Sequence, residues 1–216
     1  MRVLVQADGT SSLVIEHIKN TRRTELPSHP KVGVAYVYFD YKDRARQTPE
    51  VILAEMIKQL EFERAAYSPA DVSLSPHIKE MYDNLHHQGK RPTLSELREL
   101  ILSIGAEFGE VHLIFDALDE CNEDERKVLL PFMTQLPLAR KGNLRFKIMV
   151  TGRPYYADML CAFADAAKLA IVPDEEDMKL AIREKIEAEV AKKRHKISPQ
   201  LKADIISTVL KKADRM

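Results

Sequence analysis

The chain has 216 residues, and its 33 basic and 33 acidic side chains give a formal net charge of zero. The length fits one domain, or one domain with part of a second, and a hydrophobic share of 45% excludes a mainly disordered chain. Balanced charge argues against bulk binding to nucleic acid or to an anionic membrane. No apolar run approaches the roughly 20 residues of a membrane-spanning helix. The two cysteines form no disulfide or zinc pattern, which fits a reducing, cytoplasmic setting.

The first half of the chain alternates strand and helix signals. Residues 32–39 are apolar, β-branched and aromatic, which predicts a strand buried on both faces. A helix is predicted after Thr48, a capping residue that precedes proline, and another after Ser75 for the same reason. The capping box from Thr93 to Glu96 starts a further helix, which we expect to end at Gly109.

The second half continues the alternation and then becomes helical. We predict strands at 111–115 and 144–151, a helix between them with a kink at Pro131, an edge strand at 168–172, and two final helices at 176–194 and from Ser198 onward. Alternating strands and helices indicate an α/β fold with a parallel sheet. We expect this core over residues 1–174 and the start of a separate helical subdomain over residues 175–216.

Three carboxylates, Asp116, Asp119 and Glu120, follow the predicted strand 111–115 within five positions. Ligands of open α/β sheets bind at the carboxyl ends of strands, where one carboxylate can hold Mg²⁺ and a second can orient or deprotonate water. This is the form of a Walker B motif, and the alternative is that the acids cap the next helix. Arg153 follows the next strand and is placed either to stabilise the charge of a terminal phosphate or simply at the surface.

Two segments carry a resemblance to a known family. FDALDEC at 115–121, followed about 30 residues later by VTGRP at 150–154, resembles the NACHT class of STAND P-loop NTPases. The similarity is closer to the fungal branch whose nucleotide domain is of the nephrocystin-3 N-terminal type. It extends over nearly the whole chain, including the segments 34–43, 47–60, 91–97 and 206–216.

The resemblance implies a five-stranded sheet of the ASCE type, ATP or GTP binding with Mg²⁺, and homo- or hetero-oligomers with NACHT relatives. By position, Asp116 would be the metal and nucleotide residue, Asp119 and Glu120 the hydrolytic acids, and Arg153 the nucleotide sensor. The family usually carries serine where this chain has Gly152. The implied process is signal transduction in heterokaryon incompatibility and cell death.

The family pattern is incomplete at the start of the chain. The seven glycines form neither G-x-x-x-x-G-K-[ST] nor G-x-G-x-x-G, so a complete phosphate-binding loop is absent. The predicted helix from Ser11 resembles the helix that follows Walker A in the family. When the chain is aligned to the family pattern without gaps, Ala7 falls near the position of the lysine. Asp8 then places a negative charge where the phosphate should lie. Charge-assisted hydrogen bonds are worth about 1.5–3 kcal/mol each, so losing the lysine and two backbone contacts weakens affinity at least about a thousandfold.

Three interpretations follow from this departure. The chain is a nucleotide-binding signalling domain that is impaired as written, a gene-model fragment of a larger NACHT-repeat protein that supplies the missing loop, or a non-catalytic module that docks onto intact relatives. In the first two cases the first strand, expected at 3–7, and the phosphate loop are degenerate or missing from this chain.

Overall fold

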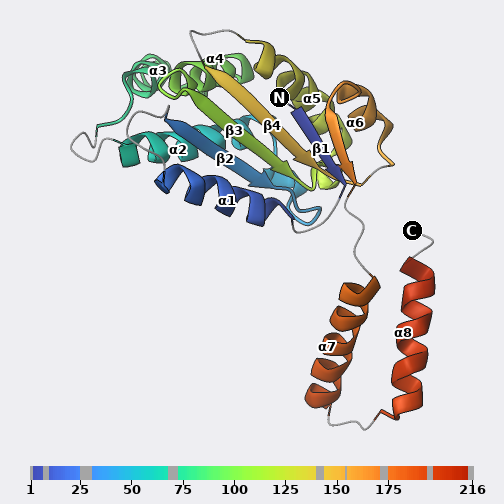
Figure 1. Cartoon of the computed structure of the whole chain (residues 1–216). Helices are drawn as coiled ribbons and strands as arrows, with labels where there is room; N and C mark the ends of the chain where they lie inside the picture. Colours follow the sequence, from blue (N-terminus) through green and yellow to red (C-terminus); the bar gives the residue numbers. More distant parts are fainter. Residues whose placement is uncertain are drawn as a thin grey trace. The chain divides into compact units, whose positions relative to one another are not determined.

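Five parallel strands form one sheet in the order β2-β3-β4-β1-β5 (Figure 1), which confirms the predicted α/β fold. The computed structural model describes residues 2–6, 10–24, 31–67, 73–139, 144–153, 155–170, 175–193 and 197–213. The strands are β1 (Arg2–Gln6), β2 (Val32–Tyr38), β3 (Glu110–Asp116), β4 (Arg145–Thr151) and β5 (Ala167–Ala170). Because the pairings are parallel, the carboxyl ends of these strands meet at one edge of the sheet.

Helices and short turns connect the strands. The helices of this part are α1 (Thr10–Thr24), α2 (Pro49–Tyr67), α3 (Pro76–His86), α4 (Leu94–Gly105), α5 (Glu123–Gln135) and α6 (Ala157–Ala162). The 3₁₀ turns are η1 (Arg44–Arg46), η2 (Leu118–Glu120) and η3 (Leu136–Leu138). Prolines stand at the start of α2 and α3 as predicted, because the first helical position needs no backbone N–H.

Helix α4 begins as predicted but ends earlier. Thr93 accepts a hydrogen bond from the backbone of Glu96, whose carboxylate accepts one from the N–H of Thr93 at 2.7 Å, so the capping box is confirmed. The helix ends at Gly105 and not at Gly109. The next residues form tight turns, and the N–H of Gly109 donates to the carbonyl of Lys31 at 2.9 Å. The chain leaves the helix early because it must join β2 in the sheet.

Successive side chains of β3 point to opposite faces of the sheet. Val111, Leu113 and Phe115 are buried in the main core with apolar residues of α2, α4 and α5. Ile114 packs in a smaller cluster with Ile15 of α1 and a residue of β2. Figure 1 shows α1 on one side of the sheet and α2, α4 and α5 on the other. We call these sides the α1 face and the α2–α4–α5 face.

Strand β2 lies at the edge of the sheet, so the prediction that it is buried on both faces holds only for its middle. Side chains of α2 form hydrogen bonds with backbone groups on the outer edge of β2. The Tyr67 hydroxyl accepts from the N–H of Val32 at 3.0 Å and donates to its carbonyl at 3.1 Å. The Gln59 amide accepts from the N–H of Tyr36 and donates to its carbonyl, both at 2.9 Å. These contacts block the edge against pairing with another strand.

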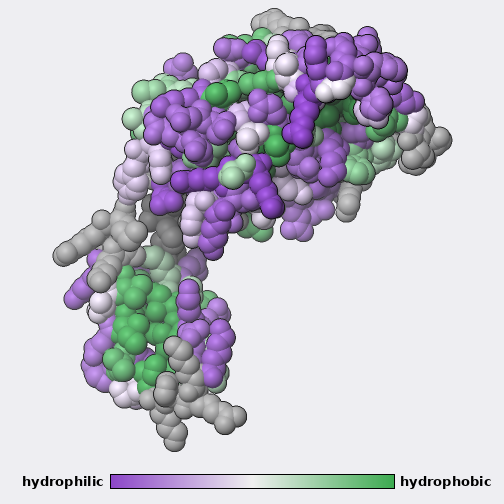
Figure 2. Space-filling model, turned by 180° about the vertical axis from the view of Figure 1, so that it is seen from behind, coloured by the Kyte–Doolittle hydropathy of each residue, from purple (hydrophilic) through white to green (hydrophobic). Residues whose placement is uncertain are grey.

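The chain divides into two compact units, Met1–Ala170 and Ile171–Met216. The second unit contains α7 (Glu175–Lys193) and α8 (Pro199–Ala213). No described side chain of α7 or α8 is fully buried, and Leu180, Leu201 and Val209 are 55%, 49% and 42% exposed. Figure 2 shows a hydrophobic area on the surface of this helical pair. In the described ranges, no helix is both long and apolar enough to span a membrane.

Candidate functional site

Asp116, the last residue of β3, meets side chains from two other elements. The hydroxyl of Ser11, in the first turn of α1, donates to Asp116 Oδ1. The hydroxyl of Thr151, at the end of β4, donates to the same oxygen at 2.6 Å. Figure 1 shows α1 beginning at the edge where the arrowheads of β3 and β4 lie. The parallel topology therefore brings together three residues that are distant in sequence.

This group of oxygens suits a hard cation with an anionic ligand. Mg²⁺ is bound by one or two carboxylates together with substrate phosphates and water, and the amino end of a helix favours negative charge. Within the described residues, His, Cys, Asp and Glu form no group of three or more that could hold a metal ion. Asp116 and Ser11 therefore fit a cation that is shared with a phosphate ligand, and not one enclosed by protein alone.

The chain reverses direction immediately after Asp116. Ala117 has φ 54° and ψ 44°, in the left-handed region, and it is the one non-glycine residue at positive φ in the described part of the chain. Such a conformation costs about 1–3 kcal/mol and persists when surrounding contacts hold it. The N–H of Ala117 donates to Thr151 Oγ1 at 2.8 Å. The turn leads directly into η2, which carries the other two predicted acids.

Asp119 is buried and paired with the predicted sensor. Its side chain is 4% exposed, and its Oδ2 accepts from Arg153 Nε at 2.7 Å. The hydrogen bond and the charge of Asp119 raise the pKa of Arg153. A Cβ on Gly152 would lie 2.7 Å from Met159 Cε and 3.1 Å from Asp119 Oδ1. A side chain at position 152 would therefore require the end of the Met159 side chain and the Asp119 carboxylate to shift.

Glu120 contacts the segment that follows β2. Its Oε2 accepts from the N–H of Tyr41 at 3.0 Å, and its carbonyl accepts from Arg44 Nε at 2.9 Å. The structure thus brings Asp116, Asp119 and Arg153 to one edge of the sheet, with Glu120 tied to the neighbouring loop. A polar residue at the end of a predicted strand could have drawn attention to Thr151, but nothing in the sequence indicates Tyr41 or Arg44.

Cys121 follows the acids but is not a reactive thiol. It is buried, and burial raises its pKa to about 11. A thiol must lose its proton to act as a nucleophile. Cys121 therefore remains protonated near neutral pH and belongs to the core, in line with its packing in the main apolar cluster.

The largest gap in the family pattern falls between β1 and α1. Ala7 and Asp8, which the sequence placed at the phosphate loop, lie outside the described residues. The bounds of the two elements leave three residues between Gln6 and Thr10. The connection between β1 and α1 is thus short, whatever its conformation.

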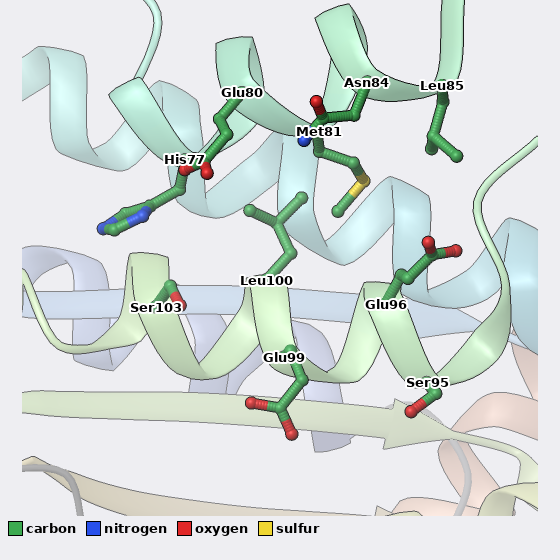
Figure 3. Close-up of a pocket in the computed structure, with 10 residues that line it drawn as sticks. All are labelled: His77, Glu80, Met81, Asn84, Leu85, Ser95, Glu96, Glu99, Leu100 and Ser103. Carbon is green, nitrogen blue, oxygen red and sulfur yellow. The ribbon is translucent and has the colours of Figure 1, made fainter. Parts of the chain in front are cut away.

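A groove of about 320 Å³ lies between α3 and α4 (Figure 3). Met81 and Leu100 point into the space between the two helices, and Glu80, Glu96 and Glu99 are among the polar residues around it. None of the predicted site residues lines this groove. It is a feature separate from the cluster around Asp116.

Comparisons with known proteins find structures of similar fold and a matching family. Among solved structures, a Walker-type ATPase of Pyrococcus abyssi matches with a TM-score of 0.51 and 15% identity, over 96% of this chain and 57% of that one. The Aeropyrum pernix Orc1 protein in complex with DNA matches with a TM-score of 0.47 and 12% identity, over 87% of this chain and 43% of that one. This chain thus spans little more than half the length of the first.

At such identities the structural likeness shows the fold alone, which is that of P-loop ATPases. No curated protein sequence matches the chain. The family described as "Nephrocystin 3, N-terminal" matches residues 10–153, a span that includes α1, Asp116 and Arg153. The chain belongs to the nephrocystin 3, N-terminal family.

Proposed function

We propose that this chain is the nucleotide-binding core of a NACHT-like signalling ATPase whose cation site is built and whose phosphate loop is impaired. The contact between Ser11 and Asp116 carries the proposal. In P-loop NTPases the serine or threonine after the loop lysine and an aspartate of Walker B hold Mg²⁺ together. Ser11 and Asp116 supply this pair at the amino end of α1 and the carboxyl end of β3.

The same contact supports a new register for the phosphate loop. In the P-loop pattern the lysine directly precedes the hydroxyl residue, so Thr10, and not Ala7, stands in its place. Gly9 then corresponds to the second glycine of the pattern, and the first would fall on Leu4, inside β1. In this register the sequence has neither the lysine nor the first glycine of the pattern.

The remaining predicted residues take the roles that the resemblance implies. Bound Mg²⁺ would neutralise phosphate charge and orient the nucleotide at Asp116. Asp119 and Glu120 are the acids assigned to positioning water, and Arg153 is assigned to the terminal phosphate. In the structure Arg153 is held by Asp119, so contact with a phosphate requires the arginine to exchange one anion for another. Its 62% exposed side chain leaves room for that movement.

Titration with a fluorescent ATP analogue and Mg²⁺ tests the proposal. We expect wild-type affinity in the millimolar range or weaker. Thr10→Lys restores one charge-assisted hydrogen bond and should tighten binding about tenfold to a hundredfold. Ser12→Lys adds the same charge two residues later and is the matched control. Asp116→Ala should remove the Mg²⁺-dependent part of binding in the Thr10→Lys background.

Each result bears on a different part of the proposal. Micromolar wild-type binding would contradict the impaired phosphate loop. Equal gains from Thr10→Lys and Ser12→Lys would contradict the register, since a nonspecific charge effect would then suffice. Unchanged Mg²⁺ dependence in Asp116→Ala would remove Asp116 from the cation site.

The second candidate is a non-catalytic module that docks onto intact NACHT relatives, and the short connection between β1 and α1 favours it. Such a module forms hetero-oligomers without using nucleotide. Co-purification with a full-length relative that is unaffected by Asp116→Ala supports this function. Failure to bind above background, together with nucleotide binding by Thr10→Lys, supports the first.

A further inference from the structure

Thr151 occupies an unusual position between the two strands that carry the site. It is 1% exposed, and the pairing of Phe115 with Val150 places it beside the end of β3. Its hydroxyl donates to Asp116 Oδ1 at 2.6 Å and accepts from the N–H of Ala117 at 2.8 Å. One side chain thus contacts the cation residue and the left-handed turn that follows it.

We propose that Thr151 is a positioning residue, whose hydroxyl orients the carboxylate of Asp116 toward a divalent cation and pins the left-handed turn at Ala117. The proposal rests on the proposed function, because that function assigns Asp116 to the cation. It adds Thr151 to the residues with a role at the site, although no role for Thr151 was predicted from the sequence.

The hydrogen bonds explain how Thr151 acts through Asp116. A hydroxyl has one proton to donate, and Thr151 gives it to Oδ1, the oxygen that also accepts from Ser11. No group in the described residues donates to Oδ2 of Asp116, which leaves that oxygen for a cation or its bound water. Thr151 is β-branched and held within the sheet, so its side chain has little rotational freedom. The carboxylate is therefore held in one orientation before any cation binds.

The bond to Ala117 extends the role to the neighbouring acids. The left-handed turn directs the chain into η2, where Asp119 meets Arg153 and Glu120 meets the N–H of Tyr41. A side chain that holds the turn in place therefore also sets the position at which η2, with its two acids, begins. A purely structural hydroxyl would satisfy the Ala117 N–H and leave cation affinity unchanged.

The test compares wild type with Thr151→Val, which keeps the shape without the hydroxyl, and Thr151→Ser, which keeps the hydroxyl. The first measurement is amide hydrogen exchange at Ala117, with the core amide of Leu113 as the control for folding. We expect exchange at Ala117 to be at least about tenfold faster in Thr151→Val and close to wild type in Thr151→Ser. If the amide of Leu113 loses protection in Thr151→Val, that variant is not properly folded, and Thr151→Ala is used in its place.

The second measurement is a titration with Mn²⁺ in the presence of ATP, because Asp116 and Ser11 fit a cation that is shared with a phosphate ligand. Paramagnetic broadening of the amide signals of Ala117 and Gly152 reports the binding. Loss of a group that orients a metal ligand costs about tenfold to a hundredfold in metal affinity. We expect that weakening in Thr151→Val and affinity within about twofold of wild type in Thr151→Ser.

Equal exchange at Ala117 in wild type and Thr151→Val overturns the proposal, as does unchanged Mn²⁺ affinity in Thr151→Val. Absence of broadening in every protein, wild type included, instead overturns the cation role of Asp116 and the proposed function with it. Exchange at Ala117 then decides by itself whether Thr151 pins the turn.

Discussion

The two faces of β3 differ in what covers them. On the α2–α4–α5 face, side chains are fully buried among several helices. On the α1 face, Glu110 and His112 are half-buried and polar, Ile114 packs against α1, and Asp116 ends the series. Because successive side chains alternate, one strand builds the core on one face and the candidate site on the other. Residue position along β3 therefore decides whether a side chain packs in the main core or lies on the face that carries the candidate site.

The largest expected effect comes from Leu113→Ala compared with Ile114→Ala. Both side chains are buried, at 0% and 1% exposure. Leu or Ile to Ala in a core costs about 2–5 kcal/mol, and the cost falls when the surroundings can collapse into the cavity. We expect Leu113→Ala to lower the free energy of unfolding by about 4–5 kcal/mol, because several helices fix its surroundings. Ile114→Ala should cost about 2–3 kcal/mol, because its described cluster is small and combines α1 with residues of the neighbouring strands.

Urea denaturation of the two variants measures this difference. Circular dichroism of the native baseline is the control for a retained fold. Equal losses of free energy in the two variants would show that the α1 face is as rigidly packed as the α2–α4–α5 face, and the comparison would fail.

A smaller loss is expected when an ion pair on the α2–α4–α5 side is broken. Arg126 Nε donates to Asp158 Oδ2 at 2.7 Å, and the two side chains are 4% and 27% exposed. Burial raises the pKa of Asp158, but hydrogen bonds from Arg126 and from the N–H of Met159 outweigh it, so the pKa is lowered on balance. Asp158→Asn leaves a buried guanidinium without its anion and should cost about 3 kcal/mol.

Thermal and urea unfolding of Asp158→Asn test this, with Glu123→Gln as the matched control. Glu123 pairs with Lys127 at the same distance of 2.7 Å, but those side chains are 68% and 56% exposed. Surface pairs contribute little, so Glu123→Gln should leave the unfolding midpoint unchanged. The advantage of wild type over Asp158→Asn should disappear as pH falls through the lowered pKa of Asp158, since protonation removes the same charge.

Much of the fold could be predicted because its signals are local. Apolar runs gave the strands, and proline and capping signals gave the starts of α2, α3 and α4. The predicted end of α4 was wrong because the observed end depends on a backbone hydrogen bond between Gly109 and Lys31. The sequence of the helix contains no sign of this long-range contact. The edge position of β2 and its protection by Gln59 and Tyr67 likewise depend on the order of strands.

The candidate site divides in the same way. Asp116 and Arg153 were predicted because each follows an apolar strand. The contacts of Thr151 were missed because they join residues 34 and 35 positions apart through the register of β3 and β4. The left-handed conformation of Ala117 was missed because alanine gives no sign of it, unlike glycine. The register that places Thr10 at the lysine position came only from the contact of Ser11 with Asp116.

The smallest expected effect concerns pH and the polar part of the α1 face. His112 Nε2 lies 2.7 Å from Glu110 Oε1, and Lys147 Nζ lies 2.6 Å from the same oxygen. Burial lowers the pKa of His112 and outweighs the opposing effect of Glu110, while Lys147 lowers it further. The unfolded chain, with the ordinary value of 6.5, then binds a proton more readily than the folded one. Stability should fall as pH drops through about 6.5, by at most about 1.4 kcal/mol per pH unit.

Urea denaturation at about pH 7.5 and about pH 5.5 measures this loss. His112→Gln keeps an amide that can donate to Glu110 but cannot titrate, so the loss attributable to His112 should vanish in that variant. His77→Gln, on the exposed side of α3, is the control and should behave as wild type. A pH dependence that persists in His112→Gln and vanishes in His77→Gln would assign the effect to His77 on α3, and not to the α1 face. The titration of His112 would then have no part in the pH dependence of stability.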